Sequence, residues 1–164
     1  MKNLLLMRHA KSSWDNAHLS DYDRPLNKRG QVNAPRMGQW LAQQELVPDL
    51  IISSSAERAL ATAEAVALAC GYEKEIQVFR TLYHGDPEDY LALLAAVPDA
   101  VQRVMMVGHN PGIAELVGQL TEAWEQMPTA AVAHVALPID HWADVNEETI
   151  GQLLALWQPR DLPG

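Results

Sequence analysis

Short apolar runs recur along the chain, and polar or glycine-containing segments separate them. The clearest runs are too short for helices and show no polar alternation, which is typical of central strands covered on both faces. A weaker run contains a glutamine. These patterns predict strands over Leu4–Met7, Asp49–Ile52 and Val104–Val107 and, for the weaker run, over Ile76–Phe79.

Apolar residues spaced by three and four positions lie between these runs and predict helices with one apolar stripe each. Ser54 or Ser55 can cap the second helix. Pro35 lies within the first stripe and should start or kink that helix, because proline lacks an N–H. Asn110 suits the N-cap of the fourth helix and Pro111 its first position. The stripes run over Gly30–Leu41, Ala56–Cys70, Tyr90–Val97 and Ile113–Leu120.

Strands that alternate with helices predict an α/β three-layer sandwich, with a central, mostly parallel sheet flanked by helices. The last quarter of the chain departs from this alternation. Ala131–Leu137 is typical of a strand, whereas Gly151–Gln158 fits either a strand paired with it or a short helix. Because no internal repeat or low-complexity segment interrupts the chain, we expect one domain over residues 1–164.

The formal net charge of -9 argues against a broad surface for nucleic acid or for an anionic membrane, since both need a positive field. The first apolar run is too short for a signal peptide or a membrane span. Cys70 is the only cysteine, which excludes an intramolecular disulfide and fits a reducing compartment. We therefore expect a cytoplasmic protein.

Basic side chains follow the predicted strands, at the edge where α/β sheets bind ligands. Arg8 and His9 follow the first strand, Arg58 lies one turn into the helix after the second, and His109 follows the Val104–Val107 run. Arginine forks match phosphate oxygens, and a neutral imidazole can attack phosphorus. The pattern therefore predicts a phosphoryl pocket that needs neither a metal ion nor another cofactor.

These residues and their neighbours resemble the histidine phosphatase superfamily, and most closely its short phosphohistidine phosphatases of the SixA type. The resemblance implies a phosphoglycerate-mutase-like fold with an antiparallel C-terminal part, and it favours a strand at Gly151–Trp157. It extends over nearly the whole chain, through motifs in the family's order. The motifs are Leu6–Ala10, Asp23–Gly30, Ser53-Ser54 with Arg58-Ala59 and Thr62-Ala63, and Val107–Asn110.

The resemblance also implies roles for individual residues. His9 would be the nucleophile and would carry a covalent phosphoryl group. Arg8, Arg58 and His109 would bind the phosphoryl oxygens. Lys11 could add attraction for an anionic substrate, although a solvated loop lysine explains it equally well.

Ser12 and Asn110 are further candidates for substrate binding, and Trp14 is the tryptophan that we place near substrate. The acid that protonates the leaving group is less clear, because no carboxylate stands at the place that the family implies. His84 and Asp86 are both candidates. For these two, a role in a turn or at a helix start fits as well as acid catalysis.

A missing acid favours phosphohistidine as substrate, because a protonated imidazole departs readily whereas an alkoxide needs a proton donor. The predicted function is therefore a metal-independent phosphatase of phosphohistidine in proteins. The alternative is a phosphatase of a small phosphate monoester or phosphoanhydride. A noncatalytic phosphoryl-binding module is a third possibility, which the intact His9 argues against.

Overall fold

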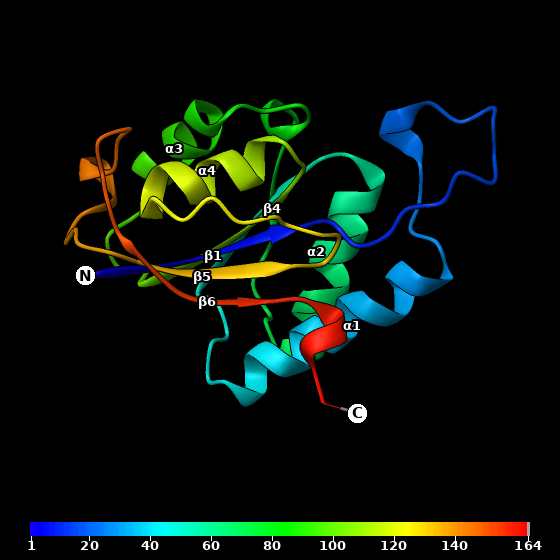
Figure 1. The fold of residues 1–164 in the computed structure, drawn as a ribbon, viewed down its shortest axis with the longest axis horizontal. Coiled ribbons are helices and arrows are strands. Elements are labelled where there is room, and N and C mark those ends of the chain that lie inside the picture. Colours follow the sequence, from blue (N-terminus) through cyan, green and yellow to red (C-terminus); the bar gives the residue numbers. More distant parts are fainter. Residues whose placement is uncertain (164) are drawn as a thin grey trace.

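One mixed sheet runs through the middle of the computed structural model, which describes residues 1–163 (Figure 1). The order of its strands is β3-β2-β4-β1-β5-β6. The strands are β1 (Lys2–Arg8), β2 (Leu50–Ser54), β3 (Gln77–Phe79), β4 (Arg103–Gly108), β5 (Val132–Leu137) and β6 (Gln152–Trp157). Each predicted strand is present, with ends that differ by a few residues.

The sheet is parallel through β1, β4, β2 and β3, as the alternation of strands and helices predicts. β5 pairs antiparallel with β1, and β6 pairs antiparallel with β5. The segment that fitted either a strand or a helix is therefore the strand β6. Its local pattern did not decide this, but hydrogen bonding to the free edge of β5 does.

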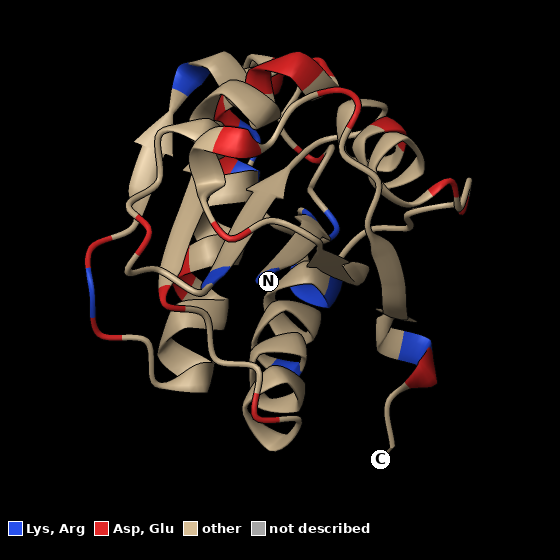
Figure 2. Cartoon of the chain, turned by 90° about the vertical axis from the view of Figure 1, so that its left-hand side faces the viewer, with Lys and Arg blue, Asp and Glu red and all other residues tan. Residues whose placement is uncertain are grey.

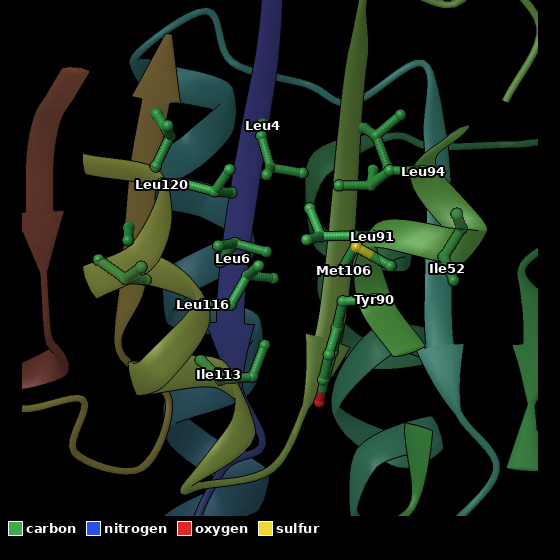
Figure 3. Close-up of a cluster of buried hydrophobic side chains, with 14 of the residues drawn as sticks. Leu4, Leu6, Ile52, Tyr90, Leu91, Leu94, Met106, Ile113, Leu116 and Leu120 are labelled. Carbon is green, nitrogen blue, oxygen red and sulfur yellow. The ribbon is translucent and has the colours of Figure 1, made fainter. Parts of the chain in front are cut away.

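Helices cover both faces of the sheet, which confirms the three-layer arrangement. Figure 1 shows α3 and α4 above the sheet and α1 below it, and α2 packs against α1 on the same face of the sheet. Leu4 and Leu6 of β1 pack toward α3 and α4, as Figure 3 shows, and Leu5 and Met7 pack toward α1 and α2. An apolar residue at each of these positions is explained by this two-sided burial. The helices are α1 (Lys28–Gln43), α2 (Glu57–Cys70), α3 (Pro87–Ala95) and α4 (Gly112–Thr121).

Two prolines differ from the helix starts expected of them. Pro35 was expected to start or kink the first helix; it does not start α1, which begins at Lys28, but lies inside it. The Asn27 side chain accepts the Gly30 N–H at 2.9 Å, and packing of the apolar stripe against α2 outweighs the hydrogen bond that proline cannot make. α4 begins at Gly112, so Pro111 occupies the N-cap instead of the first helical position.

Charge is distributed unevenly along the chain and over the fold. Ten of the twelve Lys and Arg residues precede residue 81, whereas twelve of the 21 Asp and Glu residues follow it. Figure 2 shows many of the acidic segments in the upper part of the molecule, where α3 and α4 lie. The negative net charge therefore belongs mainly to the second half of the chain. None of the helices in residues 1–163 is long and apolar enough to cross a membrane.

The segment after β1 lies against the start of α1. The Lys11 carbonyl accepts the Asn27 N–H at 3.0 Å, and the Ser13 N–H donates to the Pro25 carbonyl at 2.8 Å. Gly30 permits this approach, because a Cβ at that position would overlap the Lys11 carbonyl oxygen. Because Gly30 has no side chain, the loop that follows His9 can lie directly against the start of α1.

We predict that Gly30→Ala lowers the free energy of unfolding by about 2 kcal/mol, because the added methyl group must displace backbone. At an unconstrained helical position the same change stabilises a protein, so the sign is diagnostic. Urea unfolding measures the effect. Gln39→Ala, at an exposed position of α1, is the control and should change stability by less than about 0.5 kcal/mol. Stabilisation by Gly30→Ala would contradict the predicted overlap.

Candidate active site

A cavity of about 210 Å³ opens where β1 and β4 end. The parallel register pairs Arg8 with Gly108, and the His9 N–H donates to the Gly108 carbonyl at 3.0 Å. His9 and His109 therefore leave the sheet side by side, with ring centroids 5.1 Å apart. The lining residues are Arg8, His9, Lys11, Ser12, Trp14, Arg24, Arg58, His84, His109, Asn110 and Thr129.

The His9 ring is buried, and its hydrogen bonds define its tautomer. Nδ1 lies 2.7 Å from the Ala10 carbonyl oxygen, which can only accept, so Nδ1 carries a hydrogen. Burial lowers the pKa of His9 to about 4, against the opposing effect of the Ala10 hydrogen bond and with help from the charges of Arg58 and Arg8. At neutral pH the ring is therefore uncharged, and Nε2 carries an electron pair rather than a hydrogen.

His109 is equally buried, and Ser54 orients its ring. Nε2 lies 2.8 Å from the Ser54 hydroxyl, whose oxygen also accepts the Ala56 N–H at 3.2 Å. Because Ser54 is fully buried, its hydroxyl hydrogen needs an acceptor, and Nε2 supplies one. The ring hydrogen of neutral His109 then lies on Nδ1, which is buried without a hydrogen-bond partner among residues 1–163.

The pKa of His109 is lowered to about 3, first by burial and then by the charges of His9 and Arg58. Ser54 or Ser55 was predicted as the cap of α2, and this prediction is wrong. The N-cap is Ala56, since the Ser54 hydroxyl bonds to His109 and that of Ser55 accepts from Tyr22.

Arg58 reaches the cavity from the first turn of α2 and contacts both His9 and Asp21. Its Nε lies 3.4 Å from Nε2 of His9. Its Nη2 donates to the Asp21 carboxylate at 3.0 Å, and its Nη1 donates to the Asp21 carbonyl at 2.6 Å. Asp21 therefore holds the guanidinium in a fixed orientation beside the imidazole of His9.

Burial alone would raise the pKa of the Asp21 carboxyl group. Hydrogen bonds from Tyr83 and Arg58 oppose this, together with the charge of Arg58, and lower the pKa to about 2. The Tyr83 hydroxyl donates to Asp21 at 2.7 Å. Asp21 was not predicted as a site residue, because it begins a three-residue 3-10 turn that has no periodic pattern and lies outside the stretches that resemble the family.

Two further arginines enter the cavity. Arg8 donates through Nη1 to the Met127 carbonyl at 3.2 Å, and its buried Nε has no partner among residues 1–163. Arg24 donates through Nη1 to the Ser12 hydroxyl at 2.8 Å. Its guanidinium stacks on the Trp14 ring, with Cζ 3.4 Å from the ring centroid. Arg24 was not predicted as a site residue, although it lies in the stretch Asp23–Gly30 that resembles the family.

The remaining predicted residues are divided between the cavity and its surroundings. Asn110 lines the cavity and donates to the Met127 carbonyl at 2.9 Å. His84 also lines it, with its exposed ring 4.0 Å from that of Tyr83. Asp86 does not line it but is the N-cap residue of α3, where its N–H donates to Asp89 at 2.8 Å.

The cavity joins four cations to two uncharged imidazoles, and no Asp or Glu of residues 1–163 lines it. Such a site is suited to a phosphoryl group, since guanidinium forks bind its oxygens and an imidazole can attack its phosphorus. Within the same residues, no group of three or more His, Cys, Asp or Glu side chains is arranged to hold a metal ion.

Comparison with known proteins places this geometry in context. The model of the histidine phosphatase superfamily (branch 1) matches residues 4–87. An uncharacterized chloroplastic protein of Arabidopsis thaliana is 32% identical over 142 residues, which cover 80% of this chain and 65% of that protein, so the chain spans less than two thirds of this relative. An uncharacterized protein of Mycobacterium leprae is 32% identical over 94% of this chain and 100% of its own length.

A solved structure shows the same fold over almost the whole chain. It is the protein histidine phosphatase SixA complexed with tungstate, with a TM-score of 0.84 and 27% sequence identity. The similarity covers 98% of this chain and 99% of the other. The match confirms both the α/β architecture and the resemblance to SixA-type proteins.

We predict that NMR titration of the histidine rings gives midpoints of about 4 for His9 and about 3 for His109. Because the unfolded imidazole takes up its proton near pH 6.5, the contribution of both groups to stability is complete above that pH. It is lost as the pH falls toward the folded values. Urea unfolding at a series of pH values should show this loss, and the double variant His9→Gln/His109→Gln should reduce it. A midpoint at or above 6.5 for either ring would contradict the prediction.

We also predict that Asp21→Asn lowers kcat/KM for a phosphorylated substrate by about tenfold, because Arg58 and Arg24, which both form ion pairs with Asp21, lose the charge that orients them. Asp23→Asn is a matched control, since Asp23 lies in the same short turn and contacts Ser20 rather than an arginine of the cavity. Thermal unfolding verifies that both variants fold. Equal kinetics for the two variants would show that Asp21 does not position Arg58.

Proposed function

The chain belongs to the histidine phosphatase superfamily, and on that basis we propose that it hydrolyses phosphohistidine in a protein substrate through a covalent phosphoryl group on His9. The observation that carries the proposal is the hydrogen bond from Nδ1 of His9 to the Ala10 carbonyl, which leaves Nε2 without a hydrogen, as the acceptor of the Arg58 Nε–H at 3.4 Å. We propose the reaction for a single domain over residues 1–164 acting in the cytoplasm.

Binding of the phosphoryl group rests on the arginines of the cavity. Arg8, Arg24 and Arg58 remain charged at neutral pH and can donate several N–H groups to the phosphoryl oxygens. The buried Nδ1–H of His109 adds a neutral donor. These groups stabilise the charge that develops on the oxygens in the transition state, so the proposed reaction needs no metal ion.

In the first step, the electron pair on Nε2 of His9 forms a bond to phosphorus. The bond from phosphorus to the substrate imidazole breaks, and its electron pair stays on that ring. When the other ring nitrogen of the substrate carries a hydrogen, the leaving group is a neutral imidazole. The Ala10 carbonyl keeps its hydrogen bond to Nδ1 of His9 and stabilises the positive charge that the phosphorylated ring acquires.

In the second step, water attacks the phosphorus. A new P–O bond forms, the electron pair of the P–N bond returns to Nε2 of His9, and both hydrogens of the water leave with inorganic phosphate. The neutral imidazole is thereby regenerated. The low pKa of His9 favours this state, because the free enzyme then starts each cycle with an unprotonated nucleophile.

Phosphohistidine is the favoured substrate because the cavity offers no carboxylic acid to a poor leaving group. The lining residues within 1–163 include neither Asp nor Glu, and Asp86 faces a different hollow with Pro87 and Glu88. An alkoxide would need such a proton donor, whereas a protonated phosphohistidine ring does not.

Hydrolysis of a small phosphate monoester is the second candidate, and the position of His84 supports it. Three histidines line the cavity, and of these His84 is exposed whereas His9 and His109 are buried. A protonated imidazole there would supply the leaving-group hydrogen. The two candidates therefore differ in whether turnover depends on His84.

We predict that His9→Gln abolishes turnover and that the wild-type enzyme, quenched during turnover, carries an acid-labile phosphoryl group on His9. Mass spectrometry of base-quenched enzyme locates the group. Full activity of His9→Gln would contradict the mechanism.

His84→Gln should leave kcat/KM for a phosphohistidine peptide within about twofold and should lower that for an aryl phosphate by about tenfold or more. Asp86→Asn is the control and should affect neither substrate beyond its effect on folding. A wild-type preference for the ester by orders of magnitude would favour the second candidate.

A further inference from the structure

A second hollow adjoins the catalytic cavity and contains an excess of positive charge. Its volume is about 430 Å³, and it shares Lys11, Ser12 and Trp14 with the cavity of His9. Lys28 and Arg29, at the start of α1, form the far side. The segment Lys11–Trp14 is thus a wall with the phosphoryl site on one side and a basic hollow on the other.

The cations of this hollow are not neutralised by the protein. Lys11, Lys28 and Arg29 form no salt bridge with any carboxylate of residues 1–163, although acidic residues outnumber basic ones by 21 to 12. Asp15 lines the same hollow, and its N–H donates to the Ser13 hydroxyl at 3.1 Å. The three cations therefore exceed the one carboxylate by two charges.

The placement of Lys28 and Arg29 also opposes the electrostatics of the helix. They occupy the first turn of a 16-residue helix, which contains no acidic residue, and cations at that end are unfavourable because of the helix dipole. A bound anion would relieve the repulsion. The charges of these two side chains therefore do not stabilise the start of α1.

The wider charge distribution supports the same interpretation. Six of the twelve Lys and Arg residues line the two adjoining hollows, in a protein of net charge -9. A concentrated positive region on an acidic protein attracts anionic ligands in preference to neutral ones. One phosphoryl group would bind to the arginines of the first cavity. The cations of the second hollow would then still have no anionic partner.

We infer that this second hollow binds an acidic side chain of the substrate protein, Asp or Glu, that lies next to the phosphohistidine. The inference rests on the proposed function and adds a rule of specificity to it. The exposed indole of Trp14, 73% accessible and stacked on Arg24, provides an apolar surface between the two anions of the substrate. Substrates with acidic neighbours would then be bound at two points, and those with neutral neighbours at one.

The test compares two phosphohistidine peptides of equal length, one with Glu on both sides of the phosphohistidine and one with Gln at the same positions. Phosphorus NMR at neutral pH follows the loss of each peptide. The wild-type full chain should show a kcat/KM about fivefold higher for the Glu peptide, mainly through KM, and the preference should shrink as salt is added.

The double variant Lys28→Gln/Arg29→Gln should bring the ratio of the two kcat/KM values close to one. Its melting temperature should be unchanged or higher, because the helix dipole no longer opposes these charges. The matched control is Lys74→Gln/Arg160→Gln, which removes one lysine and one arginine from exposed positions outside both hollows and should preserve the ratio.

Each outcome has a distinct meaning. A wild-type ratio near one, or an equal fall in the test and control variants, would overturn the acidic-neighbour rule, while turnover of the Gln peptide would still support the proposed function. Failure of the wild-type enzyme to act on either peptide would overturn the proposed function, and the rule with it. A salt-sensitive preference that Lys28→Gln/Arg29→Gln alone removes would support the inference.

Discussion

Burial of β1 on both faces is the constraint on which the rest of the structure depends. Leu4 and Leu6 pack against one helical layer and Leu5 and Met7 against the other, so the strand is held in the middle of the sheet. The chain can turn polar only where the strand ends. His9, the proposed nucleophile, consequently follows directly on a strand whose apolar residues are fully buried, and the parallel register with β4 brings His109 beside it.

The same burial has opposite consequences for imidazoles and guanidiniums. Loss of solvent lowers the pKa of His9 and His109 far enough to keep both rings neutral at physiological pH. Arginine starts from a much higher pKa and stays charged in the same cavity. Burial thus leaves unprotonated imidazoles next to positively charged guanidinium groups in one cavity. Asp21 offsets part of the desolvation cost of the Arg58 guanidinium by accepting two hydrogen bonds from it.

Local sequence preferences give way in this fold where tertiary contacts compensate for them. Ser54 does not cap α2, because its hydroxyl hydrogen-bonds to Nε2 of His109 and so orients that ring. Pro35 lies inside α1 because the apolar stripe of that helix is buried against α2. In both cases a contact distant in sequence, rather than the local pattern, decided the outcome.

The sequence by itself determined the order of strands and helices, the mixed three-layer architecture and the family. Apolar periodicity is a local property that survives without knowledge of neighbours, and the motifs around His9, Arg58 and His109 are short. For Gln152–Trp157 the family resemblance favoured the strand that local periodicity left open, and pairing with β5 confirms it. Only the tertiary structure decided that Asp21 holds Arg58, and that Asp86 lies outside the cavity whereas Lys28 and Arg29 lie beside it. These outcomes depend on the approach of segments far apart in the chain, and no local pattern encodes which charged side chains meet when the loops fold over the sheet edge.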